Sequence, residues 1–291
     1  SVKLILLAVL FCAYSSKALD EDPDSEAEST VNLPEEVHQN GTNNQLDTKR
    51  AGRIYGGATV SIADYPYVAT VTFNIPSYPL VYQTGVIISD THVVTGAETF
   101  AIIVSNNLTA VIQVRAGSDY QDQNGFIFET ADFKIHDQYV SPSYLPGYNM
   151  AVVTIKGSFS GKANVKPIAL ATSPIGVSTS NIVNFVSLGW PLGGGSKLLS
   201  RIIMKLVSND CCSSFNCSML TLQCSAGVQG FSCRGGGSPV VCGNTLCGIQ
   251  LNLCDFSFSP FITVPAASIS TFLASVQPKE KKLFKCPCNS C

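Results

Sequence analysis

From residue 54 onward the chain consists of short runs rich in β-branched and aromatic residues, and Gly, Pro, Asn or Asp interrupts the sequence after each run. Short apolar runs at regular spacing, bounded by turn residues, predict antiparallel strands and an all-β barrel or sandwich. Residues 266–276 differ, since their apolar positions recur at helical spacing and predict a helix. The predicted strands cover residues 67–73, 82–89, 110–117, 126–135, 150–159, 182–190, 201–208, 238–251 and 260–264.

The segment before residue 54 has a different composition. Residues 1–18 combine Lys3, an apolar run from Leu4 to Ala13 and small residues up to Ala18, which is the pattern of a secretory signal peptide. Residues 19–53 are acidic and lack an apolar period, so we expect a disordered propeptide there. It ends in "KRAGR", which makes Arg53 the expected processing site. We therefore expect a secreted, extracellular protein.

Composition argues against two classes of partner. Only 13% of the residues are charged and the formal net charge is −2, so no basic surface for nucleic acid is expected. After the signal peptide, no apolar stretch has the length of a membrane-spanning helix. We expect neither a nucleic-acid partner nor a membrane partner.

Cysteine is concentrated at the end of the chain. Of the 12 cysteines, Cys12 lies in the signal peptide and the other eleven lie between Cys211 and Cys291. In an exported chain such clustering predicts disulfides, and the three histidines add few metal ligands, so neither a metal nor another cofactor is expected. An odd number leaves at least one cysteine free or intermolecular. The basic tail, residues 277–291, could therefore link chains into a disulfide-bonded oligomer.

One disulfide can be predicted from local geometry. The segment "CGNTLC" has the composition of a tight hairpin whose cysteines face each other across the strands, which predicts a bond between Cys242 and Cys247.

Three Asn-X-Ser/Thr sequons are candidate glycosylation sites, at Asn40, Asn107 and Asn216. Asn107 is the best candidate because it lies in a polar break between predicted strands. Asn216 is weaker because its neighbour Cys217 could be held in a disulfide.

Five segments resemble, in the same order along the chain, the landmarks of trypsin-like serine proteases. They are "RIYGG", "GVIISDTHVVTGAETF", "YNMAVVTIKGSF", "SLGW" and "SCRGGGSPVVC". They are similar to the family's activation site and to the segments around its catalytic histidine, its aspartate, a Gly-Trp strand and its catalytic serine. The resemblance covers residues 54–276 and implies two six-stranded antiparallel β-barrels with a C-terminal α-helix. Cleavage after Arg53 would give Ile54 as the new N-terminus.

The residues that carry the family's chemistry are missing at the matching positions. Peptide hydrolysis in this family needs a hydroxyl nucleophile, an imidazole base and a carboxylate that orients the imidazole. The resemblance places Glu98 at the base, Met150 at the orienting carboxylate and Gly236 nearest the nucleophile. It therefore implies a pseudoenzyme. Glu98 could receive a basic ligand, but a solvated carboxylate is the favoured interpretation.

The serine loop is one residue shorter than in the family, and Gly235 stands nearest the place of the aspartate before the nucleophile. In the family that aspartate receives the new N-terminal ammonium. Here the ammonium of Ile54 is expected to stay in solvent, unless Asp210 or Asp255 replaces the missing acid. The resemblance also puts Phe231 on the floor of the specificity pocket, which leaves no acid to receive Arg or Lys.

The resemblance implies two further disulfides, one between Cys233 and Cys254 and one between Cys224 and either Cys211 or Cys212.

The three histidines offer no replacement base. His38 lies in the propeptide, His92 at the start of a strand and His136 in a loop, and the last two are interpreted as structural or surface residues. Ser238 is the nearest hydroxyl to the lost nucleophile, but it adjoins Pro239 and is expected to be packed at the start of a strand.

The favoured hypothesis is a secreted, catalytically inactive serine protease homologue that acts by binding, as a cofactor, decoy or regulator in an extracellular proteolytic or defence cascade. Its partner would be an extracellular protein such as a protease, or a substrate or inhibitor of one. Two alternatives stay open: an active or weakly active secreted serine endopeptidase, and a disulfide-linked structural protein.

Overall fold

The computed structural model describes residues 54–55, 57–140, 146–175, 184–190, 197–207, 221–228, 231–232, 236–251 and 259–276. The predicted signal peptide, propeptide and tail (1–18, 19–53 and 277–291) lie outside these residues. So do His38, Asn40, Arg53, Asp210, Cys211, Cys212, Asn216, Cys217, Cys233, Gly235, Cys254 and Asp255.

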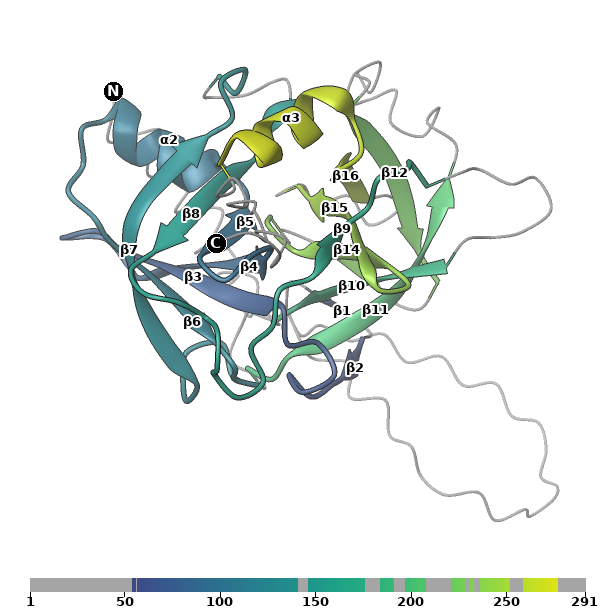
Figure 1. Cartoon of the computed structure of the whole chain (residues 1–291), viewed down its shortest axis with the longest axis horizontal. Helices are drawn as coiled ribbons and strands as arrows, with labels where there is room; N and C mark the ends of the chain where they lie inside the picture. The colour runs from purple at the N-terminus through teal and green to yellow at the C-terminus, as the bar shows by residue number, and fades with distance from the viewer. Residues whose placement is uncertain are drawn as a thin grey trace, which may run out of the picture.

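Six antiparallel strands form a closed barrel in the first half of the chain (Figure 1). In order around the barrel they are β3 (Val68–Asn74), β4 (Val81–Ile87), β5 (His92–Thr95), β8 (Ala151–Ile155), β7 (Phe126–Ile135) and β6 (Val111–Ala116). The alternation of β3 sets its two faces, since Ala69, Val71 and Phe73 enter the barrel core whereas Val68 joins a second cluster outside it.

A second ring of six strands follows, in the order β10 (Asn184–Gly189), β14 (Pro239–Cys242), β15 (Thr245–Gln250), β16 (Ser259–Thr263), β12 (Leu222–Gly227) and β11 (Ser200–Val207). Pairing of β10 with β11 closes the ring. Two short strands extend it: β2 (Ala58–Thr59) on β11, and β9 (Ala169–Leu170) parallel to β15.

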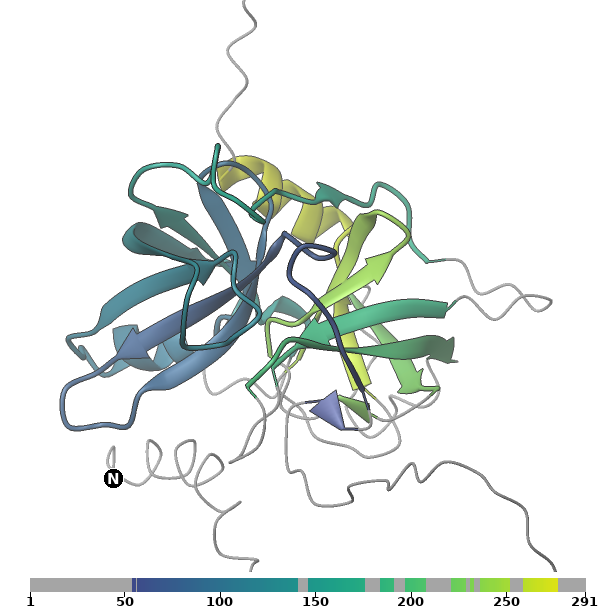
Figure 2. The same ribbon diagram turned by 90° about the horizontal axis from the view of Figure 1, so that it is seen from below.

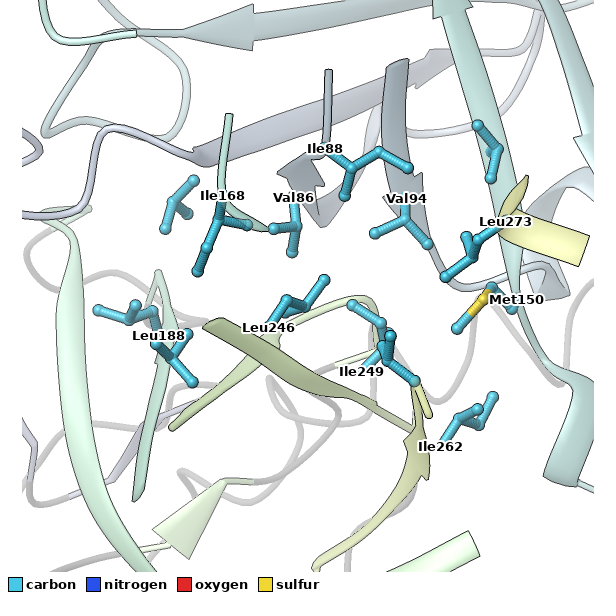
Figure 3. Packing of buried hydrophobic residues seen from close by; sticks show 14 of the residues in the cluster. Val86, Ile88, Val94, Met150, Ile168, Leu188, Leu246, Ile249, Ile262 and Leu273 are labelled. Carbon is cyan, nitrogen blue, oxygen red and sulfur yellow. The ribbon is translucent and has the colours of Figure 1, made fainter. Parts of the chain in front are cut away.

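A hydrophobic cluster joins the two barrels, which lie side by side (Figure 2). It brings together Val94 of the first barrel, Ile249 of the second and Leu273 of helix α3 (Ala267–Val276), as Figure 3 shows. Met150 lies in the same cluster and is fully buried. Because apolar burial stabilises by about 25 cal/mol per Å², this cluster holds the two barrels in one arrangement.

The predicted all-β class, the two six-stranded barrels and the C-terminal helix are confirmed. Among the elements that were not predicted are the helix α2 (Glu98–Ser105) and the strand β12. In the described part of the chain, no helix has both the length and the apolar character needed to cross a bilayer.

Candidate functional site

The turn between β5 and α2 is the point at which three distant segments meet. A Cβ atom placed on Gly96 would lie 2.6 Å from Nε2 of Gln83, 3.6 Å from Oδ1 of Asn149 and 3.7 Å from the backbone nitrogen of Gly237. Gln83 Nε2 donates a hydrogen bond to the Gly96 carbonyl oxygen at 2.9 Å. A side chain on Gly96 would displace that amide, so this hydrogen bond depends on the glycine. The turn thus holds the first barrel against the loop that precedes β14.

Asn149 fixes the start of α2 from a different part of the chain. Its Oδ1 accepts hydrogen bonds from the backbone N–H groups of Ala97, at 2.7 Å, and of Glu98, at 3.0 Å. The first N–H groups of a helix have no partner inside the helix, and Ala97 at the N-cap supplies no side-chain acceptor. Asn149 therefore performs the capping role that Ser or Asp at the N-cap usually performs.

These contacts correct one sequence-based assignment. Met150, predicted at the orienting position, is fully buried and packs into the cluster between the barrels (Figure 3). The polar group that contacts the backbone of Glu98 belongs to Asn149, the residue before Met150. The available signal was the polar residue directly before an apolar strand, and asparagine has the shape of aspartate without its charge.

Glu98 is half-buried at the first position of α2, where the helix dipole favours a carboxylate. Its charge acts on the phenol of Tyr139. Burial raises the pKa of the Tyr139 phenol, and the charge of Glu98 raises it further. The residue that the resemblance places at the base position thus carries a carboxylate in place of an imidazole.

Gly236, which the resemblance places nearest the nucleophile, and the adjacent Gly237 are both buried. Gly237 has φ of +85°, and a Cβ there would lie 2.0 Å from the Thr84 carbonyl oxygen. Hydrogen bonds hold this backbone: Gly237 N–H donates to the Gln250 carbonyl at 3.0 Å, and Gln250 N–H donates to the Ser238 carbonyl at 2.8 Å. The loop lies so close to the first barrel that position 237 cannot carry a side chain, and position 236 has none.

Ser238 does not replace the lost nucleophile in this arrangement. It is fully buried directly before β14, as expected, and its Oγ has no hydrogen-bond partner. A serine nucleophile needs a base within hydrogen-bond reach, and both described histidines have other partners.

His92 bonds within its own turn. Its Nδ1 lies 2.8 Å from Ser89 Oγ and 2.9 Å from Thr91 Oγ1, and burial lowers its pKa. His136 lies against α3, with Nε2 3.4 Å from the Ser268 carbonyl oxygen. Both are buried and neither contacts Glu98 or Gly237 in these hydrogen bonds. Their interpretation as structural residues therefore agrees with their surroundings.

The Cys242–Cys247 disulfide is confirmed, with the two Cα atoms 5.9 Å apart. Cys242 is paired with Thr245, and the register shifts between Val240 and Val241, so the two cysteines lie diagonally on one face of the hairpin. Cys224 is also disulfide-bonded. Its predicted partners lie outside the described residues.

Two further predicted residues are described only by their backbones. Ile54 of β1 (Ile54–Tyr55) pairs with Ser232, and Tyr55 pairs with Phe231 of β13 (Phe231–Ser232). The residues that follow Arg53 therefore run antiparallel to the strand that leads to the serine loop. The side chain of Phe231, predicted as a pocket floor, is not among the described ones.

The described residues contain no group of three or more His, Cys, Asp or Glu side chains placed to hold a metal ion. The polar side chains that meet at the turn include the amides of Gln83 and Asn149, which hydrogen-bond its backbone.

Sequence comparison relates this chain to trypsins of Drosophila melanogaster and to hypodermins of Hypoderma lineatum. The family model described as Trypsin matches residues 54–252. Trypsin delta of Drosophila melanogaster is 24% identical over 242 residues, which are 79% of this chain and 89% of that protein. Hypodermin-B of Hypoderma lineatum is 28% identical over 221 residues, 70% of this chain and 77% of its own length.

Solved structures give the same fold. An inactivated protease paralogue of the scabies mite has a TM-score of 0.62 at 18% identity, and the match covers 77% of this chain and 98% of that one. Neuropsin, a serine protease of mouse brain, has a TM-score of 0.58 at 20% identity, covering 75% of this chain and 97% of its own.

Proposed function

This chain belongs to the trypsin family, and from that membership and the residues at the Gly96 turn we propose that it is a secreted pseudoenzyme that binds a protein partner and does not cleave peptide bonds. One observation carries the proposal. The segments that converge on the turn supply a carboxylate, an amide and two glycines, from Glu98, Asn149 and Gly236–Gly237, and so provide neither the hydroxyl nucleophile nor the imidazole base of the family's triad.

The expected loss of rate is large. Removal of the nucleophile or the base from a catalytic triad costs about six powers of ten in kcat, which corresponds to roughly 8 kcal/mol of transition-state stabilisation. Replacing the triad aspartate by asparagine alone costs about 10⁴ even when the geometry is kept. All three positions are altered here, and hydrogen bonds occupy the backbone around Gly237.

Asn149 supports a role in which the shape of the site is kept without its chemistry. Its amide oxygen still anchors α2 through two backbone N–H groups, as a carboxylate there would. The change removes the negative charge that would stabilise an imidazolium. A protein that acts only by binding does not require that negative charge, because loops held on a rigid scaffold are enough to recognise a partner.

The partner we propose is an extracellular protein: a protease, or a substrate or inhibitor of one, in a proteolytic or defence cascade. The same fold occurs in a scabies mite protein described as an inactivated protease paralogue. A disulfide-linked oligomer through the tail cysteines is a further proposal. The runner-up function, an active trypsin-like endopeptidase, is favoured only by the names of relatives at 24–28% identity.

Activity-based labelling tests the proposal. The purified chain, cut after Arg53, is treated with a serine-directed fluorophosphonate beside active trypsin, and we expect label on trypsin alone. Turnover of peptide or ester substrates should also be absent. Ser238→Ala is the matched control, because it removes the nearest hydroxyl that could act as a nucleophile from a neighbouring position. Label or turnover that is present in the unaltered chain and lost in Ser238→Ala would overturn the proposal.

A further inference from the structure

The imidazole of His136 lies at the junction between the first barrel and the C-terminal helix. His136 follows the end of β7 and is 4% exposed. Its ring stacks on Tyr148 of the short helix η2 (Pro146–Tyr148), with ring centroids 4.9 Å apart and planes at 28°. On the other side, the Phe272 ring of α3 lies at a centroid distance of 4.8 Å. We call His136, Tyr148, Ser268 and Phe272 the α3 junction.

Hydrogen bonds define which nitrogen carries the proton. Nδ1 lies 3.2 Å from the backbone N–H of Gln138 and can only accept from it. Nε2 lies 3.4 Å from the carbonyl oxygen of Ser268 and can only donate to it. The neutral tautomer with its proton on Nε2 satisfies both contacts. In this form the imidazole bridges the first barrel and the first turn of α3.

A second proton is incompatible with this arrangement. An imidazolium would direct an Nδ1–H at the N–H of Gln138, so one contact would have to break. Burial lowers the pKa of His136, and the charge of Lys134 adds to that effect, whereas the Ser268 carbonyl and the charge of Asp137 act in the opposite direction. Lys134 Nζ lies over the Phe272 ring at 5.7 Å. Helix α3 contains no charged residue, and Tyr148 is the only titratable group of η2.

Backbone hydrogen bonds connect the junction to the candidate site. His136 N–H donates to the Met150 carbonyl at 2.9 Å, and Tyr139 N–H donates to the His136 carbonyl at 2.9 Å. Met150 follows Asn149, which caps α2 at Glu98, and Tyr139 is the phenol beside Glu98. Both segments that flank the Glu98 side of the site therefore depend on the position of His136.

We propose that His136 is a proton-sensitive contact that holds α3 on the first barrel when it is neutral, and that its protonation releases α3 and loosens the segments beside Glu98. The contact consists of residues outside the degenerate triad. It is therefore independent of whether the chain cleaves peptide bonds.

The direction of the pH effect follows from linkage. Because His136 resists protonation in the folded protein, the unfolded or opened chain binds the proton first as the pH falls below about 6.5. The contribution of His136 is complete above that pH and is lost as the pH falls through the folded pKa. Between the two pKa values the opened population rises by about tenfold for each pH unit.

Hydrogen exchange of the full chain at pH 7.5 and pH 5.0, corrected for intrinsic exchange rates, tests the proposal. In the unaltered protein we expect protection of residues 267–276 and 147–150 to fall at pH 5.0, by up to about tenfold for each pH unit below about 6.5. In His136→Gln, which keeps a side-chain N–H donor but does not titrate, this loss should disappear. His92→Gln is the matched control, since it removes the other buried imidazole away from α3, and it should behave as the unaltered protein does.

Two results would overturn the proposal. One is the same pH-dependent loss of α3 protection in His136→Gln as in the unaltered protein. The other, which needs no variant and decides the case if His136→Gln does not fold, is an NMR titration in which His136 of the native protein titrates at or above about 6.5, the ordinary value for histidine.

Discussion

At the scale of single residues, the candidate site contains glycine and amide groups that take part in packing. Gly237 is the clearest case, because its backbone conformation and its surroundings both exclude a side chain. Asn149 is the second case, because its amide oxygen accepts a hydrogen bond from the backbone at the start of α2. Both residues therefore contribute to the packing and hydrogen bonding around the turn.

Gly237→Ala is expected to lower the free energy of unfolding by more than the cost of placing alanine in a left-handed backbone conformation. Gly157 is a matched control, since its φ of +87° nearly equals the +85° of Gly237 but nothing lies within 4 Å of its Cβ position. Gly157→Ala should cost about 1–2 kcal/mol for the left-handed conformation. Gly237→Ala should cost roughly 1–3 kcal/mol more through its clash with Thr84. Urea denaturation measures both, and equal costs would contradict the close approach described here.

Asn149→Ala and Met150→Ala separate two neighbouring roles. Removing the Asn149 amide leaves two N–H groups of α2 unpaired, so we expect a loss of about 1–3 kcal/mol. Asn149→Asp should keep the cap. Met150→Ala opens a cavity in the cluster between the barrels and should cost about 2–5 kcal/mol. Hydrogen exchange distinguishes the two variants, because Asn149→Ala should lose protection in α2 before it does so in other segments. If Asn149→Ala leaves α2 unaffected, the capping role is wrong.

At the scale of elements, strands were easier to predict than the helix beside the site. The strand β7 matches its predicted bounds because its run alternates and ends at turn residues. The strand β12 contains Ser, Ala and Gly in place of β-branched residues, so its sequence gave no strand signal. Helix α2 carries Thr99, Ile102 and Ile103, which favour strands. Its cap comes from Asn149, 51 positions away, which local sequence cannot reveal.

The predicted Asn107 glycan belongs to the end of α2. Asn107 is exposed, has φ of +51° and donates its backbone N–H to the Val104 carbonyl, so it ends the helix in the left-handed conformation that asparagine tolerates. Thr109 is exposed as well. We expect a glycan here in protein from a eukaryotic secretory source, seen as a mass shift on the Asn107 peptide. Thr109→Ala should abolish it without altering the helix end. An unshifted peptide in the unaltered protein would refute the prediction.

At the scale of the whole molecule, the fold could be predicted and the site only in part. Regular apolar runs predict an all-β class, and the resemblance at the five segments adds the two barrels. The site assignment failed by one residue at Met150, because adjacent positions of an extended segment face opposite ways and a shift of one exchanges them. Packing between the barrels decides whether Asn149 or Met150 contacts the backbone of Glu98, and the local sequence does not reveal that packing.

Cleavage after Arg53 is not expected to change the order of the serine loop. In the family the new ammonium is buried against an acid, but residues 234–238 contain none. Burying the ammonium of Ile54 unpaired would cost several kcal/mol, more than the roughly 1.5–3 kcal/mol that one buried isoleucine contributes. Hydrogen exchange before and after cleavage measures this, and we expect no strong gain of protection over 234–238. A large gain would mean that an acid elsewhere, such as Asp210 or Asp255, takes the ammonium.

The short ladder between β1 and β13 has a consequence for the maturation enzyme. Proteases bind the chain they cut as an extended strand, through backbone hydrogen bonds on both sides of the scissile bond. On the C-terminal side of Arg53, the backbone of Ile54 and Tyr55 is already paired with Ser232 and Phe231. An attacking enzyme must compete for the same donors and acceptors, so the two residues have to detach before they can enter its cleft. Maturation would then proceed at a rate set by how often this two-residue ladder opens, and a ligand that strengthened the ladder would protect the chain from being cut.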